Sequence, residues 1–140
     1  MNASDRVMPL IGRILISLIF LFSGFGKLTS FNASAAFLAS KHFPIASAML
    51  VGAIIVEIIG GLCLVFGFHA RIASFVMFLY LIPATLVFHN FWALQGAARA
   101  DNQIHFLKNI AIMGGLLMVS AYGPGTLSVD GRSAAKNAGV

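Results

Sequence analysis

A single carboxylate, Glu57, lies near the middle of an apolar run that extends from Ile45 to Phe68. A helix needs roughly 20 predominantly apolar residues to cross a bilayer, so this run is long enough to place Glu57 near the midplane. A charge at that depth costs roughly 2.5 to 3.5 kcal/mol, which the apolar neighbours can offset. Intramembrane acids usually face a bundle interior or a water-filled cavity and find a partner there. Glu57 is therefore the first candidate for chemistry.

Arg13 is the predicted partner of Glu57. Residues spaced by alternating steps of four and three along the first apolar run share one helical face, which should point into the bundle. They are Arg13, Ser17, Phe20, Gly24 and Lys27. At a rise of about 1.5 Å per residue, Glu57 lies about two turns deeper than Arg13 on an antiparallel helix, and an arginine side chain covers much of that gap. We expect an Arg13–Glu57 ion pair, whose desolvation offsets most of its attraction and whose retention therefore suggests use.

A second group of polar side chains gathers at the opposite end of the predicted helices. It consists of Lys27, His89, Trp92, His105, Lys108 and Asn109. Cationic and imidazole groups can hydrogen-bond a quinone head group and stabilise its anionic reduced form, with histidine as proton donor. The group is thus a candidate quinone-binding or ligand-binding site. Simpler interpretations stay open, because Lys27 can reach the lipid headgroups, His89 can bond locally, and Trp92 suits an interfacial aromatic belt.

The composition indicates a polytopic membrane protein, with 59% hydrophobic and only 9% charged residues. Nine Lys and Arg against four Asp and Glu give a net charge of +5, but these cations are scattered, and no nucleic-acid surface is expected. The single cysteine, Cys63, cannot close an internal disulfide, and no Cys/His cluster has metal-ligand spacing. No haem, flavin or iron–sulfur motif is recognisable, so electrons for a quinone would come from a redox partner protein or a diffusible donor.

Four apolar segments predict an all-α fold, a polytopic membrane four-helix bundle that forms one domain over residues 1–140. The spans cover about residues 8–28, 45–67, 72–91 and 104–122. A short interfacial helix is expected between the first two spans, a polar loop over 93–103, and a flexible tail over 126–140. No stretch alternates with period two, which excludes strands. A cleaved signal peptide is the alternative for the first run, but its length and the later spans favour a membrane helix.

Four spans place both termini on one side of the membrane. Five cations belong to that side and four to the other. By this count the positive-inside rule predicts cytoplasmic termini.

The order of short motifs along the chain carries more information than any one of them. They are Arg13, Ser23-Gly24-Phe25-Gly26-Lys27-Leu28, Glu57, Gly67 with Arg71, His89-Asn90-Phe91-Trp92, Phe106-Leu107-Lys108-Asn109, Gly114-Gly115, and Gly123-Pro124-Gly125 followed by Ser128-Val129-Asp130. Together they resemble the DoxX family of small four-span membrane proteins, and in particular its bacterial inner-membrane branch. The resemblance covers nearly the whole chain.

This resemblance implies a four-helix protein of the bacterial inner membrane that is often described as an oxidoreductase. Relatives look like the membrane subunit of a thiosulfate:quinone oxidoreductase, and others accompany redox-stress enzymes. The lone Cys63 means that thiol chemistry would need a partner protein. The resemblance assigns no catalytic residue to this chain.

Three functions therefore stay open for a protein whose immediate partner is the lipid bilayer. The first is a quinone-interacting subunit of a membrane oxidoreductase system. The second is a small proton or solute transporter centred on Glu57, which with four spans would be expected to form a homo-oligomer. The third is a non-catalytic scaffold of a redox-stress complex, in which polar side chains only set helix register.

Overall fold

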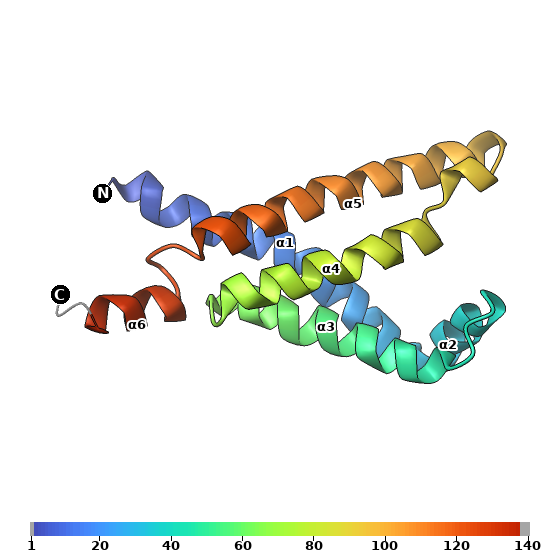
Figure 1. Cartoon of the computed structure of the whole chain (residues 1–140), viewed down its shortest axis with the longest axis horizontal. Coiled ribbons are helices and arrows are strands. Elements are labelled where there is room, and N and C mark those ends of the chain that lie inside the picture. The colour runs from blue at the N-terminus through green and yellow to red at the C-terminus, as the bar shows by residue number, and fades with distance from the viewer. Residues whose placement is uncertain (1, 138–140) are drawn as a thin grey trace.

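A computed structural model describes residues 2–137 of the chain. These residues form α1 (Ala3–Thr29), α2 (Phe31–Ser40), α3 (Ala46–Phe66), α4 (Ala70–Phe88), the short 3₁₀ helix η1 (Phe91–Ala93), α5 (Gly96–Tyr122) and α6 (Val129–Asn137). The start of α1 and α6 lie at one end of the molecule, called here the terminal end, and α2 and the α4–α5 connection lie at the other, the α2 end (Figure 1).

Four helices are long and apolar enough to cross a membrane: α1, α3, α4 together with η1, and α5. No strand occurs within residues 2–137, so the predicted all-α polytopic bundle with a short helix between the first two spans is confirmed. Large apolar side chains cover its outer surface, such as Phe22 and Leu15 with exposed fractions of 77% and 63%. Lipid hydrocarbon is a solvent for such side chains, and the helices satisfy their own backbone hydrogen bonds.

Glycines bring the spanning helices close together. A Cβ at Gly24 would lie 2.7 Å from Ile58 Cγ1, and a Cβ at Gly60 would lie 2.6 Å from Met77 Sδ. In lipid, such small residues allow the close packing that replaces the hydrophobic drive of water. They join α1 to α3 and α3 to α4 around a core formed by Phe20, Leu64, Met77, Leu81, Met113 and Leu116.

α1 and α5 close the ring of spans only in part. They touch where Gly115 packs against Ile16, with a Cβ at Gly115 falling 2.8 Å from Ile16 Cδ1. Toward the α2 end the two helices diverge (Figure 1), and theirs is the least extensive of the contacts between neighbouring spans. The bundle is therefore tight at the terminal end and forked at the α2 end.

The chain after α5 folds back onto the α3–α4 turn, whereas the sequence predicts a flexible tail from residue 126. The carboxylate of Asp130 accepts the backbone N–H groups of His69 and Ala70, both at 2.9 Å. It thereby caps the start of α4, and its own N–H donates to Gly67 O at 3.0 Å. Gly67 has a φ of 65°, a left-handed conformation that glycine adopts without a Cβ penalty. Residues 138–140 of the predicted tail lie outside the described residues.

Two helices begin earlier than the predicted spans. α1 starts at Ala3, where the Asp5 carboxylate accepts the N–H of Asn2 at 3.0 Å in a capping box. α5 starts at Gly96, inside the segment predicted as a polar loop. Hydropathy locates only the apolar part of a helix, and a helix can continue past it with exposed polar side chains such as Arg99 and Asp101.

Candidate functional site

Glu57 is buried inside the bundle and paired with Lys27. Glu57 is only 4% exposed, and Lys27 Nζ lies 2.8 Å from both oxygens of its carboxylate. Tyr80 of α4 donates its hydroxyl to Glu57 Oε1 at 2.7 Å. The ammonium of Lys27 also donates to Ser23 Oγ, one turn earlier on α1. Three helices thus meet at one carboxylate, and we call Lys27, Glu57 and Tyr80 the buried triad.

The predicted Arg13–Glu57 pair is wrong. Arg13 is 1% exposed and donates to the backbone carbonyls of Leu64 and Leu127, at 2.8 and 2.7 Å. Leu64 is seven residues along α3 from Glu57, or about 10 Å at the helical rise. The cause is the tilt of helical side chains toward the helix N-terminus. Arg13 tilts away from the bilayer centre, toward the terminal end, whereas Lys27 tilts back from the α2 end toward Glu57.

Tyr80 belongs to the site although the sequence reasoning missed it. The sequence did contain an indication of its role, because Tyr80 is the one tyrosine in the interior of an apolar span, whereas Tyr122 ends a helix. A phenolic hydroxyl buried in an apolar region usually finds a hydrogen-bond partner. Glu57 was therefore the natural acceptor, but the sequence does not show which face of α4 meets α3.

The predicted basic group is largely brought together at the α2 end. The rings of His89 and His105 stack with centroids 5.2 Å apart, and Lys108 Nζ lies 3.1 Å from His105 Nδ1. Asn109 is buried and donates to Thr85 Oγ1 at 3.1 Å, which fastens α5 to α4. His105 and Lys108 are exposed and retain donor capacity.

Trp92 differs from the rest of the predicted group. It is 55% exposed and packs edge-on against Phe91 and Phe106, outside the cavity described next. Its position on the surface of the α2 end fits an interfacial side chain.

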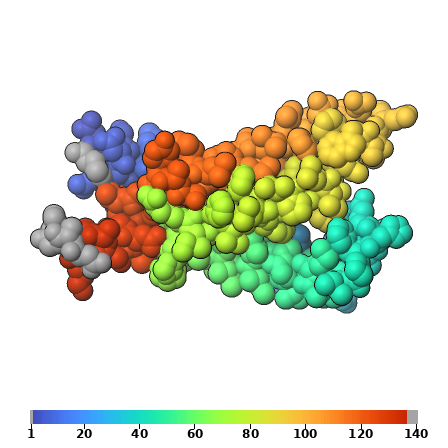
Figure 2. All heavy atoms as spheres, viewed as in Figure 1, coloured from blue at the N-terminus to red at the C-terminus, as the bar shows by residue number. Residues whose placement is uncertain are grey.

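A cavity of about 1060 Å³ joins the buried triad to the basic group. It lies between α1, α2, α3, α4 and α5 at the α2 end, where Figure 2 shows the surface notched between α2 and the end of α4. Its polar wall consists of Ser23, Lys27, Ser34, Glu57, Tyr80, His89, His105, Lys108 and Asn109. The remaining wall is apolar and includes the aromatic rings of Phe20, Phe37, Phe43 and Phe88.

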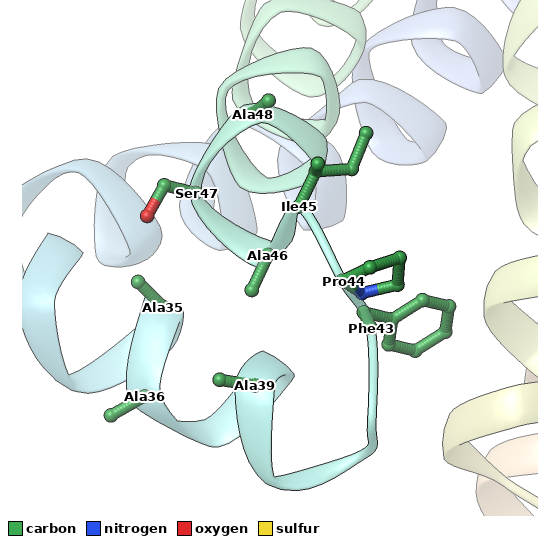
Figure 3. Close-up of a pocket in the computed structure, with 9 residues that line it drawn as sticks. All are labelled: Ala35, Ala36, Ala39, Phe43, Pro44, Ile45, Ala46, Ser47 and Ala48. Carbon is green, nitrogen blue, oxygen red and sulfur yellow. The ribbon is translucent and has the colours of Figure 1, made fainter.

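A second hollow, of about 590 Å³, lies on the surface between α2 and the start of α3. Figure 3 shows Ala35 and Ala39 of α2 opposite Ala46 and Ser47 of the first turn of α3, with the hydroxyl of Ser47 at one side. Its lining offers no charged or imidazole side chain. The large cavity is therefore the candidate site.

The comparisons with known proteins agree with this architecture. The model of the DoxX family matches residues 8–90. The chain is 32% identical over 131 residues to the inner membrane protein YphA of Escherichia coli (strain K12), a match that covers 94% of each protein. It is 34% identical over 131 residues to the inner membrane protein YqjF of the same strain, covering 93% of this chain and 95% of the relative.

A shorter match links the chain to a eukaryotic protein. It is 34% identical over 77 residues to the ER-derived vesicles protein ERV29 of Saccharomyces cerevisiae, covering 55% of this chain and 25% of that protein. No solved structure matches the chain.

Proposed function

This chain belongs to the DoxX family, and from that premise we propose that it is a multi-pass inner-membrane protein that binds a quinone in the cavity at its α2 end. The observation that carries the proposal is the cavity itself, which combines an aromatic wall with polar groups at the level of the spans. Small-molecule sites of about 300 to 1,000 Å³ are usually built in this way, largely apolar with a few placed polar groups.

The forked arrangement of α1 and α5 supports a ligand that arrives from the membrane. Both helices line the cavity, through side chains such as Ser23 and Ile112, and they diverge toward the α2 end (Figure 1). A quinone is dissolved in the bilayer and can enter laterally between two weakly packed helices. A water-soluble solute would not use an opening between helices that faces the lipid.

The polar groups suit a head group with oxygen atoms at two opposite positions. Lys108 and His105 offer N–H groups near the exposed end of the cavity, and the buried triad lies in another part of its wall. The rings of Phe37 and Phe88 stack with centroids 6.1 Å apart and offer apolar surface to an aromatic ring. The quinone would exchange electrons with a redox partner protein or a diffusible donor, which makes the chain one subunit of an oxidoreductase system.

The test is to extract the protein from membranes and measure the quinone that co-purifies. Ala53→Phe adds a ring to the cavity wall and should lower the bound quinone about tenfold, equivalent to about 1.4 kcal/mol. Ala111→Phe makes the same change at an exposed position of α5 outside the cavity and should leave it unchanged. His89→Ala and Lys108→Ala should each weaken retention about threefold to tenfold, whereas Trp92→Ala should not.

Two results would overturn the proposal in favour of other functions. If no quinone co-purifies and all variants still support the protein's cellular role, the polar side chains serve a scaffold. If no quinone binds but Glu57→Gln abolishes a proton or solute flux in proteoliposomes, the protein is a transporter. If Ala53→Phe retains as much quinone as the unaltered protein, the quinone binds outside this cavity.

A further inference from the structure

The polar hydrogen atoms of the buried triad are all used in hydrogen bonds within the triad or to Ser23. Both oxygens of Glu57 lie 2.8 Å from the ammonium of Lys27, and a carboxylate in such an ion pair can only accept hydrogen bonds. The hydrogen in the 2.7 Å contact between Tyr80 and Glu57 Oε1 must therefore come from the tyrosine. Once that hydroxyl donates to Glu57, its oxygen has only lone pairs left to offer.

Lys27 has no donor to spare for a ligand either. An ammonium has three N–H groups, and those of Lys27 are directed to Glu57 Oε1, Glu57 Oε2 and Ser23 Oγ. Glu57 Oε1 accepts two of the recorded bonds, from Lys27 and Tyr80, whereas Oε2 accepts only one. Within the triad itself, the hydrogen-bonding capacity that remains for a ligand is acceptor capacity on Glu57 Oε2 and on the tyrosine oxygen.

From this arrangement we infer that the triad recognises a ligand hydroxyl, so that the cavity binds a hydroquinone more tightly than the corresponding quinone. The inference rests on the proposed function and adds the redox form of the ligand. A hydroquinone O–H can donate to Glu57 or Tyr80, but a quinone carbonyl has no hydrogen and would face their lone pairs. An unmatched polar contact of this kind costs affinity because the buried acceptors lose their interaction with water.

The exposed end of the cavity does not discriminate between the quinone and the hydroquinone. Lys108 and His105 offer N–H groups there, and both a quinone carbonyl and a hydroquinone oxygen can accept them. The discrimination between the two forms therefore belongs to the triad. A hydrogen bond to a charged acceptor is worth enough to favour the reduced form by about tenfold to a hundredfold.

The experiment compares three ligands that share a tetramethyl six-membered ring and two para oxygens but differ in the hydrogens or methyl groups on those oxygens. Detergent-purified full chain is dialysed to equilibrium without oxygen against duroquinone, durohydroquinone or the dimethyl ether of durohydroquinone. We expect durohydroquinone to bind at least about tenfold more tightly than the other two. The ether is the stricter comparison, because it keeps two oxygens on an aromatic ring but has no hydrogen to donate.

Two variants locate the effect in the protein. The pair Lys27→Met with Glu57→Gln removes both charges together and should reduce the preference to about threefold or less. Ser74→Ala removes another buried hydroxyl of α4, one that bonds Ala70 O outside the cavity, and should keep the full preference.

The outcomes separate the inference from the proposed function. Equal binding of the two redox forms, or tighter binding of duroquinone, would overturn the inference and leave quinone binding in place. The same holds if the preference survives in the double variant. Failure of all three ligands to bind would overturn both.

Discussion

Glu57 is accommodated inside an apolar bundle because a lysine ammonium and a phenol bind its two oxygens. Lys27 approaches from α1 and Tyr80 from α4, while the close approach at Gly24 brings α1 against α3. The depth of Glu57 and its need for a partner could be predicted from the sequence alone. The partner does not follow from spacing alone, because spacing along a helix gives only height and face, whereas the tilt of helical side chains toward the helix N-terminus moves Arg13 away from Glu57 and Lys27 toward it. For that reason Arg13 was the expected partner and Lys27 is the real one.

The losses of stability from removing Lys27 and from removing Glu57 should not be additive. Lys27→Met leaves the buried Glu57 uncompensated, at a cost of about 3–5 kcal/mol, whereas Glu57→Gln leaves a lysine that can still reach polar surroundings and should cost less. The double variant should lose clearly less than the sum of the two. The measurement is a double-mutant cycle on the free energy of unfolding in detergent.

The control cycle pairs Arg13→Met with Glu57→Gln. Since Arg13 bonds Leu64 and Leu127 instead, these losses should add within about 0.5 kcal/mol. Strong coupling of Arg13 to Glu57, together with additive losses for Lys27 and Glu57, would reverse the assignment of the ion pair.

The helices were predictable as membrane spans but not in their full length or in their attachments. An apolar run shows where a helix crosses lipid, whereas the capping group at Asp5 and the polar first turns of α5 lie outside that run. The docking of α6 was hidden for another reason. Asp130 is one of several polar residues near the end of the chain, and only the fold shows that it caps α4.

Asp130→Ala should loosen the start of α4. It removes two hydrogen bonds to backbone N–H groups and a negative charge beside a helix N-terminus, a loss of about 1–2 kcal/mol. Hydrogen–deuterium exchange should show the amides of His69 and Ala70 exchanging about tenfold faster, as a loss of about 1.4 kcal/mol predicts.

The matched control is Asp101→Ala, which removes an exposed aspartate from α5. Surface changes of this kind usually stay within about 0.5 kcal/mol, so exchange at His69 and Ala70 should not change. Equal exchange in Asp130→Ala and the unaltered protein would show that α6 does not hold this turn.

The molecule as a whole is closed at the terminal end and hollow at the α2 end, and this asymmetry determines where a ligand can lie. Arg13, Leu127 and Asp130 fasten the terminal end through backbone groups. At the other end α1 and α5 diverge around a cavity of about 1060 Å³ (Figure 1). The gathering of basic side chains there was predictable from their positions near span ends, whereas the cavity was not, because it depends on how far apart the helices lie.

The central claim is that this cavity holds a quinone, and photoaffinity labelling with an azido-quinone tests it most directly. Membranes that contain the protein are illuminated with the probe, and the modified residues are identified by mass spectrometry with and without excess unlabelled quinone. We predict that label removed by the competitor lies on cavity-lining residues such as Phe37, Met49 and Phe88. Label confined to lipid-facing residues such as Phe22, Ile59 and Met118, and unchanged by the competitor, would contradict the claim.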